Sequence, residues 1–255
     1  MTATPPVVLT VAGTDSGGGA GIAADLATFA ALGTHGVCAV AVVTAQDTTA
    51  VHRLHQVPLE VLEAQLQAVL TDFPVAAVKT GLLGSAGAVE LVARVVGQRG
   101  AGLPLVVDPV LRATTGACFA DDDVIAAYRE HLLPRASVVT PNAHELDLLG
   151  LLTVPVVRTG SETGDDVLLT PAAPPVRLPH DPVETTNDHG TGCTYSAALT
   201  AHLALGWSLP EAAARAGAFT AAQLRRSRTW LLGAGRGPIA HLLTTPMSAH
   251  HLGGN

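Results

Sequence analysis

The chain has 255 residues, which is enough for one large α/β domain or for two small ones. Hydrophobic residues make up 48% of it but aromatic residues only 3%, so we expect a core built from Ala, Val and Leu. The formal net charge of −7 excludes the basic surface that non-specific nucleic-acid binding requires.

The cysteines and the hydrophobic runs indicate the cellular compartment of the protein. Cys38, Cys118 and Cys193 are odd in number and have no C-x-x-C spacing, which indicates neither a disulfide framework nor a zinc site. The most hydrophobic run, residues 36–45, has about half the length of a bilayer span. The N-terminus has no basic region of the secretory type. We therefore expect a cytoplasmic protein with neither a membrane nor a nucleic-acid partner.

Runs of β-branched residues alternate with helical patterns up to residue 140. The sequence predicts strands at residues 7–12, 37–44, 76–79, 105–107 and 137–140, and helices at about 20–32, 59–73, 86–96 and 124–133. Repeated β-α units of this kind imply a mainly parallel sheet with helices on both faces, that is, a three-layer α/β/α fold.

The later part of the chain has a different pattern. Residues 152–184 are rich in Pro, Gly and Thr and predict loops with two short antiparallel strands, at 154–157 and 167–170. A helix is expected from about 193 to 205, and Ser208-Leu209-Pro210-Glu211 has the spacing of a capping box that opens a last long helix. Because no repeat or linker interrupts the pattern, we expect a single domain over residues 1–255.

A glycine-rich stretch at residues 13–21, GTDSGGGAG, follows the first predicted strand. Glycines let a backbone approach a ligand closely and present N–H groups to it. The stretch lacks the Gly-Lys-Ser/Thr ending of a P-loop, and it does not match the dinucleotide fingerprint. By itself it predicts either a ligand-binding loop or a plain tight turn.

A second glycine-bearing turn, Gly190-Thr191-Gly192-Cys193, precedes a predicted helix. Unpaired backbone N–H groups and the helix dipole make such a turn a suitable site for phosphate groups and for the charge that develops in phosphoryl transfer. Cys193 falls in the first helical turn, where we expect a lowered thiol pKa. An ordinary helix entry with a buried cysteine is equally compatible with these residues alone.

Oxygen-bearing side chains follow two of the buried strands. Asp108 ends the strand at 105–107, and Asn142 and Glu145 come just after the strand at 137–140. Ligands collect beyond the carboxyl ends of the strands in open α/β sheets. These side chains are therefore candidates to position Mg²⁺ through water. Helix capping by Asn142 and exposure of Glu145 are the simpler alternative.

Taken in this order, the motifs resemble the ribokinase-like superfamily, and within it the hydroxymethylpyrimidine/phosphomethylpyrimidine kinases of thiamine biosynthesis. The segments that carry the resemblance span nearly the whole chain: AGTDSGGGAGI at 12–22 with Asp25, TAQDT at 44–48, VKTGLL at 78–83, VDPV at 107–110, TPNAHE at 140–145, HGTGCTYSAA at 189–198 and GRGP at 235–238.

The resemblance implies an ATP- and Mg²⁺-dependent kinase that phosphorylates hydroxymethylpyrimidine and then converts its monophosphate to the diphosphate. It assigns Gln46 to the aminopyrimidine, because an amide offers both a donor and an acceptor. It assigns the remaining residues as follows: Gly13, Ala20, Asp25, Leu82 and Val110 to the pyrimidine pocket, Asp108, Asn142 and Glu145 to the ATP phosphates, Asp108 and Glu145 also to Mg²⁺, and Gly190, Thr191, Gly192 and Cys193 to the anion hole.

The resemblance also implies a role for Cys193. Most members of the superfamily carry Asp at this position, as the base that takes the proton of the substrate hydroxyl, whereas Cys is typical of the pyrimidine kinases. A thiolate can take that proton, although phosphoryl transfer depends more on positioning and charge stabilisation. Relatives are commonly dimers, so we also expect a homodimer.

The chain departs from the family pattern in one region. Only 44 residues, Leu146–His189, separate Glu145 from Gly190, which is fewer than relatives have. The helix that normally follows the Asn-x-x-Glu motif is expected to be nearly absent. Arg158-Thr159-Gly160 is the nearest counterpart of a Lys-Gly-Gly-like strand end. Arginine keeps the positive charge in a forked geometry, so we assign Arg158 to ATP binding.

Three alternatives remain open from the sequence. A pyridoxal kinase of the same fold is compatible with Cys193, since a thiol can attack an aldehyde, and Gln46 does not exclude pyridines. A non-catalytic sensor of a thiamine precursor is supported only by the shortened segment. A thiol hydrolase would use Cys193 as nucleophile and need a positioned base such as His189.

Overall fold

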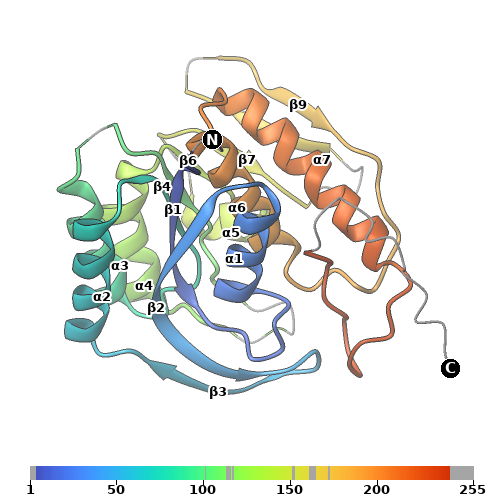
Figure 1. Ribbon diagram of the computed structural model, residues 1–255, viewed down its shortest axis with the longest axis horizontal. Coiled ribbons are helices and arrows are strands. Elements are labelled where there is room, and N and C mark those ends of the chain that lie inside the picture. The colour runs from blue at the N-terminus through green and yellow to red at the C-terminus, as the bar shows by residue number, and fades with distance from the viewer. Residues whose placement is uncertain are drawn as a thin grey trace, which may run out of the picture.

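The structure is a computed structural model that describes residues 4–100, 102–112, 116, 118–150, 153–160, 165–171 and 173–241. Within these residues a nine-stranded sheet has the order β3-β2-β1-β4-β5-β6-β7-β8-β9 (Figure 1). The strands are β1 (Val7–Gly13), β2 (His35–Gln46), β3 (Val51–Gln56), β4 (Val75–Thr80), β5 (Leu105–Val107), β6 (Val138–Val139), β7 (Val156–Arg158), β8 (Asp165–Leu169) and β9 (Val176–Pro179).

Helices cover both faces of this sheet (Figure 1). They are α1 (Gly21–Ala31), α2 (Leu59–Asp72), α3 (Ala86–Gly97), α4 (Asp122–Ala127), α5 (Ala143–Leu149), α6 (Thr191–Ala204) and α7 (Leu209–Ser227), and α4 continues through a π turn (Tyr128–Leu132) and a 3-10 turn (Leu133–Arg135). The buried side chains of α2 to α5 share one hydrophobic cluster. Those of α1, α6 and α7 form two others on the opposite face. The predicted three-layer α/β/α fold is therefore confirmed.

The pairing within the sheet is parallel at its centre and antiparallel at both edges. Strands β2, β1, β4, β5, β6 and β7 pair in parallel, whereas β3 pairs antiparallel with β2, β8 with β7, and β9 with β8. The central strands are buried on both faces and rich in valine, as parallel strands require. The carboxyl ends of β1, β4, β5 and β6 consequently meet at one edge of the sheet.

The sequence located most elements but missed three. Strands β3 and β9 were not predicted: β3 is polar and largely exposed, and β9 has four residues, so neither has a strong hydrophobic pattern. The expectation that a helix after the Asn-x-x-Glu motif is nearly absent is wrong. The helix α5 is present because Asn142 and Glu145 form a capping box that satisfies the N–H groups of its first turn.

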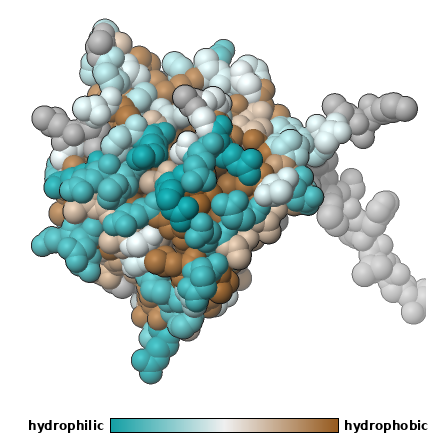
Figure 2. All heavy atoms as spheres, turned by 90° about the vertical axis from the view of Figure 1, so that its left-hand side faces the viewer, coloured by the Kyte–Doolittle hydropathy of each residue, from teal (hydrophilic) through white to brown (hydrophobic). Residues whose placement is uncertain are grey.

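The face formed by α2, α3 and α4 carries hydrophilic side chains with hydrophobic ones between them (Figure 2). An exposed ion pair between Arg94 and Glu63 joins α3 to α2 on this face, with 3.0 Å between nitrogen and oxygen. None of the described helices combines the length and the low charge that crossing a bilayer demands.

Candidate functional site

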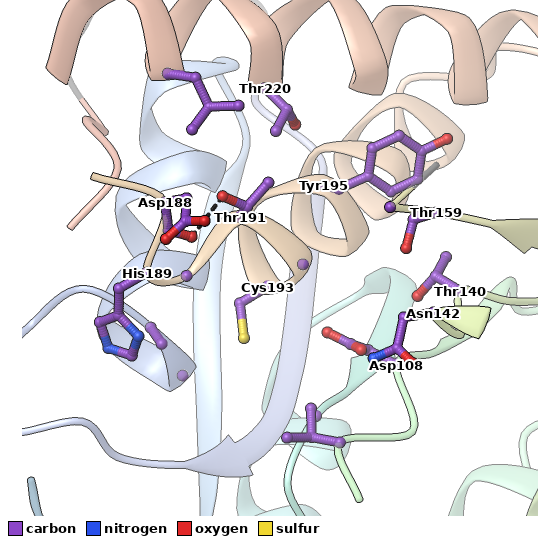
Figure 3. A pocket seen from close by; sticks show the side chains of 18 of the residues that line it. Asp108, Thr140, Asn142, Thr159, Asp188, His189, Thr191, Cys193, Tyr195 and Thr220 are labelled. Carbon is purple, nitrogen blue, oxygen red and sulfur yellow. Dashed lines mark hydrogen bonds between the residues drawn. The ribbon is translucent and has the colours of Figure 1, made fainter. Parts of the chain in front are cut away.

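A cavity of about 540 Å³ lies where β1, β4, β5 and β6 end and α6 begins. Figure 3 shows Cys193 at the start of α6 with its sulfur pointing into this space. Asp108, Thr140 and Asn142 lie on one side of the sulfur, and Asp188, His189 and Thr191 on the other (Figure 3). The cavity is therefore enclosed by loops that the parallel sheet brings together.

The turn before α6 requires glycine at its first position. Gly190 has φ +88°, in the left-handed region, and a Cβ there would overlap the carbonyl oxygen of Gly19. The close approach works in both directions, since a Cβ on Gly19 would lie 2.6 Å from Cδ2 of His189. The glycine-rich loop and the α6 turn thus pack backbone against backbone, although more than 160 residues separate them in the sequence.

A buried pair, Asp15 and His189, holds these two segments together. The carboxylate of Asp15 accepts hydrogen bonds from the N–H groups of Gly17 (2.8 Å), Gly19 (3.1 Å) and Ala20 (2.9 Å). Its Oδ2 also lies 2.7 Å from Nε2 of His189. Burial by itself would raise the pKa of Asp15, but these hydrogen bonds outweigh it and lower the pKa. Because an ionised carboxylate only accepts, His189 is the donor.

The C-terminal part of the described chain braces the same turn. The N–H of His189 donates to the carbonyl of Gly237, and the N–H of Ile239 donates to the carbonyl of His189, both at 3.0 Å. One residue earlier, Asp188 forms an ion pair with Arg236, and its carbonyl accepts the hydroxyl of Thr191 at 2.6 Å (Figure 3). These contacts fix the backbone that presents the first turn of α6.

That first turn has free donors directed at the cavity. No described residue accepts the backbone N–H groups of Gly192 or Cys193, which are among those a helix N-terminus leaves unpaired. Both residues line the cavity. The turn therefore offers the oriented N–H groups and the dipole that stabilise phosphate oxygens.

A buried ion cluster reaches from the cavity wall to below its floor and is centred on Lys79, the only lysine of the chain, whose side chain is fully buried. Its Nζ lies 2.6 Å from Oδ1 of Asp25 and 4.0 Å from Oδ2 of Asp108. Burial by itself lowers the pKa of Lys79, but the carboxylates, Asp25 foremost, outweigh it and hold the pKa above its usual value. The ammonium therefore stays charged below the site.

Two hydroxyl groups complete this cluster. Thr10 donates to Oδ2 of Asp25 at 2.6 Å, and Ser196 donates to Oδ2 of Asp108 at 2.9 Å. Strands β1 and β4 and the helices α1 and α6 each contribute one member, and the residue directly after β5 contributes the fifth. The charges are thus held by the same elements that form the core.

The structure contradicts the expectation that the thiol of Cys193 has a lowered pKa. Burial raises the pKa of Cys193 to about 12; Lys79 opposes this effect, and the nearby carboxylate of Asp108 adds to it. The position in the first helical turn is as predicted, but desolvation and negative neighbours outweigh the helix dipole. The thiol is consequently protonated at neutral pH.

The cavity is also lined by two acidic side chains, Asp108 and Glu145, and the charge of Asp108 destabilises the ionised form of Glu145. Burial and the charge of Asp108 raise the pKa of Glu145 to about 8, although the N–H groups of Asn142 and Leu111 donate to it. Burial also raises the pKa of Asp108. A divalent cation bound between such carboxylates would stabilise their ionised forms, so this pair fits Mg²⁺.

The far end of the cavity is built by the shortened segment and by α7. Thr159 and Gly160 after β7, and residues 181–185 after β9, form one wall, and Gly217, Thr220 and Leu224 of α7 form the other. Nε2 of His180 lies 3.4 Å from Oδ2 of Asp166 on the same wall. Although shortened, this segment still closes the cavity on the side away from Gln46.

Comparisons with known proteins place this arrangement in a family. The family model described as phosphomethylpyrimidine kinase matches residues 15–158 and 151–240. The chain belongs to the phosphomethylpyrimidine kinase family. It is 40% identical to the hydroxymethylpyrimidine/phosphomethylpyrimidine kinase of Rhizobium meliloti, over 92% of this chain and 96% of that one.

Two further relatives bear on the pathway and on the acceptor. The chain is 38% identical to a thiamine biosynthesis bifunctional protein of Geobacter sulfurreducens, over 92% of this chain and 52% of that protein. A pyridoxal kinase from Staphylococcus aureus, solved with pyridoxal, superposes with a TM-score of 0.81 and 31% identity over 94% of each chain. Both acceptor classes thus occur on this fold.

The cavity brings together most of the residues that the family resemblance singled out. It is lined by Gly13, Ala20, Gln46, Leu82, Asp108, Val110, Asn142, Glu145, Gly190, Thr191, Gly192 and Cys193. Asp25 and Arg158 are not among the lining residues. Asp25 lies beneath the floor because its carboxylate is bound to Lys79 and Thr10. Arg158 is exposed at the end of β7, while the next two residues reach the cavity.

Sequence reasoning missed other residues of this family site. It gave Lys79 no role, and it did not connect Asp15 with His189. It also missed Arg112 and the wall formed by α7. The motifs contain Lys79, Asp15 and His189, so a signal existed, but only the folded chain shows which of them pair. Gly217, inside a long helix, was the one local sign of the α7 wall.

We predict that Lys79→Met destabilises the protein by about 3–5 kcal/mol, because it leaves Asp25 and Asp108 buried without a cation. The free energy of unfolding from urea titration measures this. Adding Asp25→Asn to Lys79→Met removes one of the uncompensated charges and should restore part of the loss. A Lys79→Met protein within about 1 kcal/mol of wild type would show that the ammonium does not stabilise the cluster.

Proposed function

We propose that this chain transfers the γ-phosphoryl group of ATP to the hydroxyl of 4-amino-5-hydroxymethyl-2-methylpyrimidine, and then to the resulting monophosphate, in thiamine biosynthesis. The observation that carries the proposal is the cavity in which Gln46 and the glycine loop lie at one end and Thr159, Gly160 and α7 at the other. Between them lie the free N–H groups of the α6 turn and the carboxylates Asp108 and Glu145. Acceptor, transferring group and nucleotide thus have consecutive places.

The acceptor end is suited to a small flat ring. Gln46 offers an amide donor and an amide acceptor to an aminopyrimidine, and Leu82 and Val110 supply apolar contact. The backbone of Gly13 lies close to the side chain of Leu82, since a Cβ on Gly13 would be 3.2 Å from Cδ2 of Leu82. This end therefore orients the hydroxymethyl group towards Cys193.

At the transfer point the chain supplies charge stabilisation. The N–H groups of Gly192 and Cys193 donate hydrogen bonds to the oxygens of the γ-phosphate, while Lys79 contributes a buried positive charge below. We propose that Asp108 and Glu145 hold Mg²⁺, which neutralises phosphate charge when bound. Among the described residues no group of three or more His, Cys, Asp and Glu could hold a metal alone, so ATP phosphates would complete its coordination.

We propose Cys193 as the base that takes the proton of the acceptor hydroxyl. Because its thiol is protonated at neutral pH, it is a weak base. The thiol-hydrolase alternative loses support, because the ring of His189 is bound to Asp15 and the Cys193 thiol is protonated.

We further propose that the chain works as one domain, as a cytoplasmic homodimer. Exposed apolar side chains at the β2–β3 edge, Val43 and Leu54, support an interface there.

Pyridoxal is the second candidate acceptor, favoured by the pyridoxal kinase that superposes on this chain. We predict that the protein turns over hydroxymethylpyrimidine and its monophosphate at least tenfold faster than pyridoxal in a coupled assay with Mg-ATP. Gln46→Leu should lower kcat/KM for hydroxymethylpyrimidine by roughly 5–100-fold, the cost of one or two hydrogen bonds, while affecting pyridoxal less. Faster turnover of pyridoxal would reverse the assignment, and binding without turnover would indicate a sensor.

We also predict that Cys193→Ala slows the first phosphorylation more than the second. The first acceptor is an alcohol that must lose its proton, whereas the second is a phosphate that is already ionised. Because the thiol is neutral, we expect a loss of about tenfold in kcat of the first step, below the roughly 10²–10⁴ of a full general base. Cys118→Ala, which removes an exposed thiol outside the cavity, is the matched control. Equal slowing of both steps would contradict this role.

A further inference from the structure

The second phosphorylation poses an electrostatic problem that the first does not. Its acceptor is a phosphate monoester that carries nearly two negative charges at neutral pH. This acceptor must approach the γ-phosphate of ATP within bonding distance. An oxygen of the acceptor phosphate attacks the γ-phosphorus and forms a new P–O bond, and the bond to ADP breaks with its electron pair left on ADP. The ionised oxygen has no proton to lose.

The cavity is negatively lined and has few means to offset this charge. Its acidic residues are Asp15, Asp108, Glu145, Asp166, Asp181 and Asp188. Among the described lining residues, Arg112 is the only lysine or arginine. Lys79 lies beneath the floor and is already engaged by Asp25 and Asp108. Within the part of the chain that the structure describes, Arg112 is therefore the one permanent cation that lines the cavity.

Arg112 is also uncommitted. No hydrogen bond or ion pair joins its guanidinium to any other residue that the structure describes. The acids around the cavity have partners of their own: Asp15 has His189, Asp108 has Ser196, Asp166 has His180, Asp181 has Arg225 and Asp188 has Arg236. A cation of this kind at a cavity wall is available for an anionic ligand.

Arg112 lies close in the chain to Val110, which the proposed function places at the acceptor end of the cavity. It follows Val110 by two residues, and both line the cavity, whereas Leu111 between them is buried in the core. The N–H of Leu111 points at Oε1 of Glu145 (3.4 Å), and its carbonyl accepts from the N–H of Phe119 (2.9 Å). Leu111 thus anchors the chain directly before Arg112 through both its N–H and its carbonyl group.

We propose that Arg112 binds the phosphate of the monophosphate acceptor and so serves the second phosphorylation specifically. The inference rests on the proposed function and adds to it a residue that separates its two steps. A guanidinium fork matches two phosphate oxygens at once. The first acceptor is neutral at its hydroxymethyl group and gains nothing from this contact. Arg112 is then a specificity-determining residue for the phosphorylated acceptor.

The test measures the two half-reactions separately, with purified alcohol and purified monophosphate as acceptors and Mg-ATP as donor. Arg112→Ala should lower kcat/KM for the monophosphate at least tenfold, while the value for the alcohol and the KM for ATP stay within twofold. For Arg112→Lys, kcat/KM for the monophosphate should lie between the values of wild type and Arg112→Ala, because lysine keeps the positive charge but lacks the forked guanidinium. Arg94→Ala, at an exposed arginine of α3 outside the cavity, should change neither step.

Calorimetry with a non-hydrolysable ATP analogue and Mg²⁺ supplies a readout that does not depend on turnover. The dissociation constant of the monophosphate should rise at least tenfold in Arg112→Ala, and that of the alcohol should not change. Equal losses for both acceptors, or a raised KM for ATP, would assign Arg112 to the nucleotide and overturn the proposal. An unchanged second step would overturn it as well. A wild-type protein that phosphorylates neither acceptor would instead refute the proposed function.

Discussion

The site depends on the contact between two backbone segments that the sequence places far apart. The glycine-rich loop after β1 and the turn before α6 approach so closely that neither Gly19 nor Gly190 has room for a side chain. The buried pair of Asp15 and His189 bridges them, and the carboxylate also gathers three N–H groups of the loop. This contact therefore fixes the glycine-rich loop against the turn that presents the N–H groups of α6.

The buried charges explain why a cysteine is compatible with this position. Lys79 neutralises part of the negative charge of Asp25 and Asp108 directly under the α6 turn. A third carboxylate at position 193 would add further negative charge to a desolvated cluster, whereas a thiol with a pKa of about 12 adds none. The neutral thiol shifts the catalytic task towards the backbone N–H groups, towards positioning and towards the cation that Asp108 and Glu145 are suited to hold.

The sequence predicted the central parallel strands and the helices that cover them, because buried valine runs and helical periodicity are strong local signals. It failed where a segment has no such signal, as in the polar edge strand β3 and the four-residue β9. The motifs located most of the cavity wall, but they could not show that Asp25 lies below it or that His189 donates to Asp15. The thiol pKa of Cys193 was predicted in the wrong direction, since burial among carboxylates is a property of the assembled fold.

The central claim is that the Asp15–His189 pair aligns the acceptor loop with the transfer point, and the coupling between ATP use and acceptor phosphorylation tests it most directly. The measurement is the number of ADP molecules formed per acceptor phosphorylated, in wild type, His189→Ala and His189→Gln. We predict a ratio of about one for wild type. For His189→Ala we predict a ratio well above one and at least a tenfold lower kcat of transfer. His189→Gln should recover part of both, because its amide can still donate a hydrogen bond to Asp15. A His189→Ala protein that keeps a ratio of one and a wild-type kcat would contradict the account.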